Sequence, residues 1–160
     1  MDMEQRHELQ KKGHYGKMVL MLAISFVIMY TVMFLNVDDS AHIYLSLTRT
    51  YMTLLMITPM ALLMLWVMPM MYPDKKRNAI IQGSAVVIFA LSLLALRSQS
   101  FISDRQYMKA MIPHHSSVIL TSKNANIKDP RVRELSNKII QSQEEEIARM
   151  KALLEEVDKN

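Results

Sequence analysis

Apolar residues fill three long segments of the chain, and a polar tail follows them. The segments cover residues 18–35, 51–72 and 78–96, and none has Lys, Arg, Asp or Glu in its interior. A helix needs about 20 apolar residues to cross the hydrocarbon core of a bilayer, which is about 30 Å thick. The pattern therefore predicts an all-α protein in a lipid bilayer, with three transmembrane helices within residues 18–97.

Basic residues flank these segments unequally. The leader, residues 1–17, is basic, and so is the connection at residues 73–77. Their basic residues are Arg6, Lys11, Lys12, Lys17, Lys75, Lys76 and Arg77. The connection between the first two segments has only Arg49 against Asp38 and Asp39. Because short cytoplasmic loops are enriched in Lys and Arg, we expect the leader in the cytoplasm and residues from about 98 onward outside it.

The tail, residues 98–160, has the pattern of two helices. Ser103 is a suitable N-cap for a first helix that ends near Lys123. Asp129-Pro130 is an N-cap followed by proline at the first helical position, which predicts a second helix ending near Val157. Two helices of this length have too little core to be stable alone. We therefore expect a homodimer, in which two hairpins form a four-helix bundle.

Composition excludes several classes of site and partner. The chain has 160 residues, 16 Met and no Cys, so disulfides, thiolate metal sites and Cys nucleophiles are excluded. The net charge of +4 comes from residues that flank the apolar segments, which is no nucleic-acid signal. Ser116-Ser117 follows His115 without a third orienting group, so we expect no enzyme.

Two thioethers and two imidazoles lie close together in the first tail helix: Met108, Met111, His114 and His115. At about 100° per residue, Met108, Met111 and His115 share one narrow arc with Asp104, and His114 is on its flank. Thioether and imidazole ligands suit the soft cation Cu(I). Methionines at this spacing are also common in ordinary cores, so the residues alone leave both interpretations open.

The second tail helix would add to this arc. A turn centred near Ile127 sets three of its residues opposite the arc: Gln143, Glu146 and Met150. In this register Glu146 is opposite Met108, and His115 is at the level of Ile139. We expect Met150 as a further ligand. Asp104, Gln143 and Glu146 would surround the ligands, where such groups fix an imidazole tautomer.

The spacing of these residues resembles a known family. The pattern is Asp104-x2-Tyr107-Met108-x2-Met111-x2-His114-His115, followed by Gln143-x2-Glu146-Ile147-x2-Met150. It is similar to the ferritin-like "domain of unknown function 305" family over residues 101–155. The resemblance implies an extracytoplasmic helical domain in copper and silver binding and tolerance, anchored in a bacterial inner membrane. Many members have additional helices, which again favours assembly of this short tail. Di-iron bundles need Glu-x-x-His, which this tail lacks.

The second apolar segment has a methionine at every fourth position: Met52, Met56, Met60, Met64 and Met68. Each step drifts by about 40° around the helix, so the row winds instead of forming a straight stripe. The row would make an oligomeric Cu(I) conduit or would simply pack, since Met is an adaptable apolar side chain. His42 would be an accessory ligand or a solvated loop residue, and His7 and His14 belong to the leader. A third alternative is a structural or partner-binding membrane protein without metal.

Overall fold

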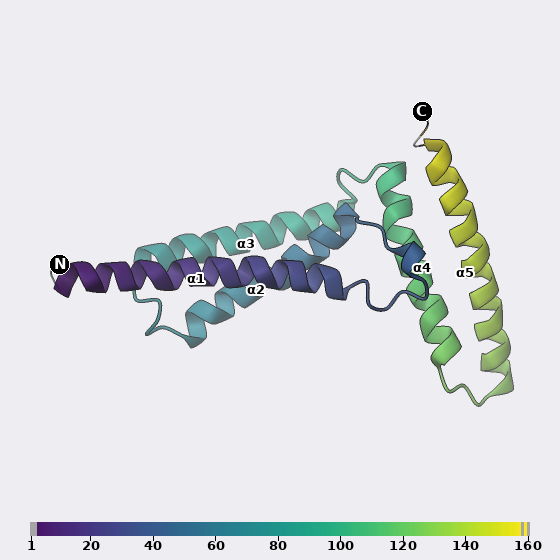
Figure 1. The fold of residues 1–160 in the computed structure, drawn as a ribbon, viewed down its shortest axis with the longest axis horizontal. Helices are drawn as coiled ribbons and strands as arrows, with labels where there is room; N and C mark the ends of the chain where they lie inside the picture. Colours follow the sequence, from purple (N-terminus) through teal and green to yellow (C-terminus); the bar gives the residue numbers. More distant parts are fainter. Residues whose placement is uncertain (1–2, 158, 160) are drawn as a thin grey trace. The chain divides into compact units, whose positions relative to one another are not determined.

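The computed structural model describes residues 3–157 and 159, with side chains from residue 13 onward. Residues 1–2 of the predicted leader, and 158 and 160 of the predicted tail, lie outside the described residues. The described secondary structure is all-α, as predicted (Figure 1). In chain order the elements are α1 (Met3–Val32), the 3-10 turn η1 (Ser40–His42), α2 (Leu47–Val67), α3 (Lys75–Ser98), α4 (Asp104–Asn124) and α5 (Pro130–Val157).

The described residues form two compact units. The first unit contains residues 3–31 and 50–100, and the second contains residues 32–49, 101–157 and 159. The first unit holds α1, most of α2, and α3, which are long and apolar enough to cross a membrane. Many large apolar side chains of these helices are exposed, including Leu20, Val27, Trp66, Leu91 and Leu94. Such a surface is unfavourable in water and suits contact with lipid.

The helix boundaries differ from those of the apolar segments. The second segment was expected over residues 51–72, but α2 runs from Leu47 to Val67. It passes through Pro59 and ends two residues before Pro69, because proline disfavours the helical conformation of the residue that precedes it. The first segment was expected over residues 18–35, but α1 begins within the leader and ends at Val32.

The second unit is built on an antiparallel hairpin of α4 and α5 (Figure 1). Both predicted N-caps are confirmed. The Ser103 hydroxyl accepts a hydrogen bond from the backbone N–H of Gln106 at 3.4 Å, and Asp129 Oδ1 accepts one from the N–H of Arg131 at 2.9 Å. The core between the helices consists of Met108, Ile112, Ile119, Ile147 and Leu154. α4 continues through Pro113 to Asn124.

The connection between α1 and α2 is also part of the second unit, although the sequence placed it within the transmembrane region. We call residues 36–47 the docked loop, because backbone and side-chain groups along its length bond to α4. The backbone N–H of Asp38 donates to Ser116 Oγ at 2.8 Å, and the N–H of Leu47 donates to Gln106 Oε1 at 3.0 Å. Lys123 Nζ lies 2.9 Å from Asp38 Oδ2. The hairpin therefore gains a third packed segment.

Candidate metal-binding site

The expected ligands on α4 lie at different depths. Met108 and His115 are buried, at 6% and 8% exposure. Met111 is half-buried and His114 is exposed. Met150, on α5, is half-buried and packs against the cluster that contains Met108. Met108 and His115 are seven residues apart, which places them two turns apart on one helix face. The α4–α5 interface therefore contains Met108, His115 and Met150, with His114 on its outer side.

His115 faces a carboxylate of the opposite helix. Its Nδ1 lies 3.2 Å from Glu146 Oε2, and Glu146 Oε1 accepts a hydrogen bond from the Ser142 hydroxyl at 2.9 Å. The Nδ1–Oε2 distance is that of a hydrogen bond, but its alignment is poor, and Nδ1 has no aligned partner among the described residues. A nearby carboxylate favours the proton on Nδ1, which leaves the Nε2 lone pair as the ligating atom.

Burial sets the charge of this imidazole. The pKa of His115 is lowered, chiefly because burial penalises the charged form. The Glu146 carboxylate acts in the opposite direction, and the neighbouring His114 lowers the pKa further. The two rings meet edge to face, with centroids 5.9 Å apart. His115 is therefore neutral around pH 7, which is the form that binds metal ions.

The pairing of His115 with Glu146 corrects the predicted register. The sequence placed His115 at the level of Ile139 and set Glu146 opposite Met108, whereas Glu146 lies against His115. Side chains on a helix lean toward its N-terminus, and in an antiparallel pair the two leans add. His115 therefore reaches a residue further along α5 than the backbone levels suggest. Glu146 nevertheless lies beside an imidazole, as expected.

The other two surrounding residues lie further from the interface. Asp104 is exposed in the first turn of α4, where a negative charge stabilises the helix dipole. Gln143 is half-buried on α5, one turn before Ile147. Among the described residues, no three His, Asp or Glu side chains are arranged to hold a metal ion. A metal site at this interface would therefore depend on thioether ligands, which select soft cations such as Cu(I) and Ag(I).

The docked loop brings a residue to α4 that the sequence did not connect with it. His42 Nδ1 lies 2.9 Å from the Ser116 hydroxyl, which also accepts the N–H of Asp38. Ser116 therefore has a histidine neighbour from outside the tail. Its side chain has no exposed surface. One indication of this contact was present in the sequence: Ser116 is a small polar residue on the buried helix face that also carries His115 and Ile119.

The methionines of the row that begins in α2 differ in how exposed their side chains are. Met52, Met56 and Met68 are 41%, 49% and 44% exposed, whereas Met64 is 9% exposed and packs against α1 residues. This is the winding expected for a four-residue repeat. Within one chain the row therefore runs from the outer surface of the first unit into its core at Met64, and Met68, just after α2, is exposed again.

Comparison with known proteins identifies the family. Residues 87–156 match the family described as "Domain of unknown function (DUF305)". The chain is also 38% identical over 141 residues to "Uncharacterized protein L153" of Acanthamoeba polyphaga mimivirus, a similarity that covers 86% of this chain and 91% of that protein. It therefore extends beyond the tail into the apolar helices. No solved structure matches the chain. The protein belongs to the DUF305 family, as its Met-His and Gln-Glu-Met motifs predicted.

Proposed function

We propose that this protein is a membrane-anchored Cu(I)-binding protein of copper homeostasis or resistance, which also accepts Ag(I). The observation that carries the proposal is the setting of His115. It is a buried, neutral imidazole whose Nδ1 faces Glu146, on the same helix face as Met108 and across from the helix that carries Met150. The ligands are Met108, Met111, His114, His115 and Met150.

The charge of the ligands favours a monovalent soft cation. Thioethers and neutral imidazoles carry no charge, and the nearest carboxylate, Glu146, already faces His115 Nδ1. Burying a divalent cation among such groups would leave most of its charge uncompensated. Cu(I) and Ag(I) carry a single charge and bind sulfur well. The exposed His114 is the first contact for an incoming ion, and the buried residues hold it.

The basic leader and the basic first turn of α3 support an orientation for the membrane anchor. With these segments in the cytoplasm, the hairpin lies on the periplasmic side of a bacterial inner membrane. Copper arriving from outside would then meet the hairpin first. We propose a binding role without catalysis and without nucleic acid as a partner.

A second copy of the chain is the expected protein partner. Apolar residues of α5 remain exposed beside the hairpin core, among them Val132, Leu135 and Leu153. A shallow groove lined by Val132, Leu135 and Ile139 lies between α5 and the end of α4. A second hairpin would cover these residues and complete a four-helix bundle. Leu135→Glu should then convert a dimer to a monomer in sedimentation measurements, and a parent protein that is monomeric would contradict the dimer.

The test of the function is a competition titration with Cu(I) and a chromophoric chelator on the detergent-solubilised full chain. The test variant combines Met108→Leu, Met111→Leu, His114→Gln and His115→Gln, which keep side-chain volume similar and remove the ligands. The control is Met70→Leu, at a 95% exposed methionine that is not a proposed ligand. We expect the parent and the control to bind Cu(I) tightly, and the test variant to lose a Cu(I) equivalent.

Each alternative function has its own result in the same system. Equal Cu(I) binding by parent and test variant would mean that these Met and His residues of the tail only pack and do not bind metal. A conduit predicts that Met56→Leu, Met60→Leu and Met64→Leu abolish Cu(I) flux into vesicles while leaving the hairpin site filled. A structural protein without metal predicts unchanged metal content and tolerance after His114→Ala and His115→Ala.

A further inference from the structure

A histidine of the first unit has an unexplained buried nitrogen. His14 lies on α1, and its Nδ1 is fully enclosed, with no hydrogen-bond partner among the described side chains. A buried polar nitrogen without a partner is unfavourable, because it has lost its water and gained nothing. Native proteins rarely contain such groups without a bound water, an ion or a functional role. The surroundings of His14 distinguish between these.

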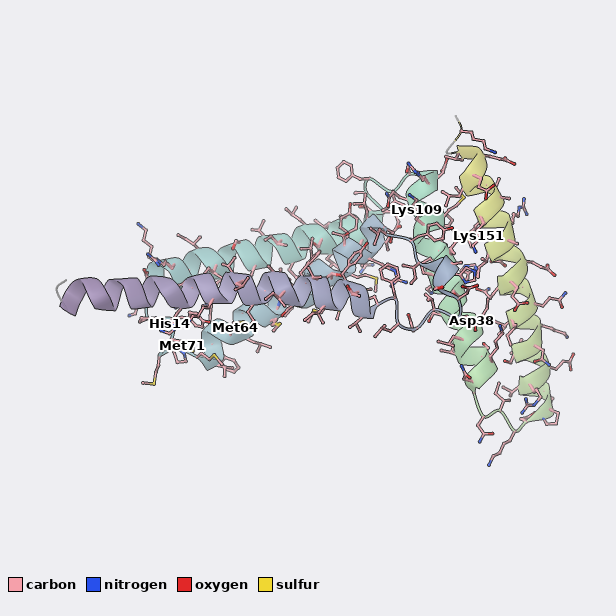
Figure 2. The ribbon with its side chains drawn as sticks, in the orientation of Figure 1. His14, Asp38, Met64, Met71, Lys109 and Lys151 are labelled. Carbon is pink, nitrogen blue, oxygen red and sulfur yellow. The ribbon has the colours of Figure 1, made fainter. Side chains whose placement is uncertain are left out.

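Methionines lie near His14 in the sequence and at the same end of the first unit. Met18 is one helical turn after His14 on α1 and is 1% exposed. Met18 belongs to the same buried cluster as Met64 of α2. Met71 follows in the turn after α2 and directly precedes Tyr72, another member of the cluster. Figure 2 shows His14, Met64 and Met71 gathered at the same end of the first unit.

The chain holds this end of the unit in a fixed arrangement. The Tyr15 hydroxyl donates to Asn78 Oδ1 at 2.7 Å, and the backbone N–H of Asp74 donates to the Tyr15 hydroxyl at 3.2 Å. The rings of Tyr15 and Tyr72 lie 5.2 Å apart. These contacts tie the α1 segment that carries His14 to the turn that follows Met71. The neighbouring ligand candidates are therefore ordered before any ion binds.

We propose that His14, Met18, Met64 and Met71 form a second soft-metal site, separate from the hairpin, which binds Cu(I). His14 Nδ1 supplies the nitrogen and the methionines supply sulfur. Water satisfies a buried nitrogen best where it finds several polar partners, and this cluster offers mostly thioethers and aromatic rings. A soft cation uses those same thioethers as ligands.

The charges around the cluster select a monovalent ion. The three thioethers carry no charge, and the Asp74 carboxylate is occupied at the start of α3, where it accepts the backbone N–H groups of Lys76 and Arg77. Arg77 also pairs with Asp74 at 3.1 Å and lies over the Tyr15 ring. Among the described side chains, a divalent cation would therefore meet Arg77 and a carboxylate that is already engaged, whereas Cu(I) brings only one charge to a cluster that contains several thioethers.

The experiment removes the hairpin ligands first, so that the two sites are measured separately. The background is the full chain in detergent carrying Met108→Leu, Met111→Leu, His114→Gln and His115→Gln. We expect this background to retain one Cu(I) per chain in the chelator competition. Adding His14→Leu and Met64→Leu should lower the remaining affinity at least about 100-fold, since even changes to groups behind metal ligands cost 10- to 100-fold. Adding Met70→Leu instead, at the neighbouring methionine that is 95% exposed, should leave the Cu(I) affinity of the background unchanged.

A second variant and a spectroscopic measurement guard against misfolding. Met71 is 38% exposed, so Met71→Leu should weaken Cu(I) binding while leaving the helical circular dichroism unchanged. X-ray absorption of the Cu(I)-loaded background should show mainly sulfur neighbours with one nitrogen, and His14→Leu should remove the nitrogen. A background that binds no Cu(I) would overturn this site. Binding that persists after His14→Leu and Met64→Leu would also overturn it, whatever the hairpin does.

Discussion

Ser116→Ala tests whether the docked loop is held to α4 by one buried hydroxyl. Ser116 has no exposed surface, and its Oγ accepts the backbone N–H of Asp38 at 2.8 Å and lies 2.9 Å from His42 Nδ1. The substitution removes both contacts without changing the helix, since alanine is a strong helix former. It leaves the Asp38 N–H and the His42 ring to find water or remain unpaired.

The expected cost follows from these two contacts. Each hydrogen bond contributes about 1 kcal/mol net, and more where the abandoned partner stays buried. Asp38 and His42 are partly accessible to water, so the lower value applies to each. We expect a loss of about 2 kcal/mol, which corresponds to about 30-fold in the opening equilibrium of the loop. The loop should open locally before the hairpin unfolds.

Amide hydrogen exchange on the full chain in detergent measures this opening. In Ser116→Ala the protected amides of residues 36–47 should exchange about 30-fold faster, while those in the middle of α5 change much less. Ser117→Ala is the matched control, because Ser117 Oγ accepts an exposed hydrogen bond from Asn36 Nδ2 at 2.8 Å. Its effect should stay below about 1 kcal/mol. If both variants exchange alike over the loop, the buried hydroxyl does not anchor it.

Three further changes test the second unit, each followed by chemical denaturation monitored by circular dichroism. Ile112→Ala, at a side chain with 0% exposure, should lower the free energy of unfolding by about 2–5 kcal/mol. Val132→Ala, at 48% exposure, should lower it by less than about 1 kcal/mol. Similar losses in the two variants would contradict the assigned core. Asp129→Ala removes the N-cap of α5 and should cost about 1 kcal/mol, so an unchanged midpoint would contradict the cap. The pKa of His42 is lowered by burial and by Lys151, against the opposing effects of Asp39 and Asp38. The folded state therefore favours neutral His42, and this contribution to stability is complete above the unfolded pKa of about 6.5 and is lost as the pH falls through the lower folded pKa. His42→Gln should reduce this acid sensitivity, and an unchanged pH profile would contradict the assignment.

The features that local chemistry determines could be predicted from the sequence. The three apolar segments were predicted as long helices, because each is long and has no charged residue in its interior, and the structure has a long helix in each. Ser103 and Asp129 cap helices because their side chains reach N–H groups only two or three residues away. The family motif was readable because its residues recur at helical spacing. None of these predictions needed knowledge of a distant part of the chain.

Features that depend on distant contacts could not be predicted in the same way. The partner of His115 on α5 depends on the lean of two side chains and on the path of residues 125–129. The docked loop depends on contacts such as His42 with Ser116, which are 74 residues apart. The sequence assigned His14 to a basic leader, and the enclosure of its Nδ1 is visible only in the folded chain, beside α1 residues that pack against α2.

Methionine can serve both the core and the proposed metal site of the hairpin, because its thioether is apolar and also a ligand. Met108 is 6% exposed among Ile112, Ile119 and Ile147, where a carboxylate ligand would be a buried charge. Its three rotatable bonds let the sulfur turn toward an ion while the methylene groups stay packed. Met108→Leu retains the volume and removes the sulfur, so the cost in stability should stay below about 1.5 kcal/mol. Loss of Cu(I) without loss of the fold would therefore identify Met108 as a ligand. His115→Ala cannot separate the two roles, because it also removes the partner of Glu146.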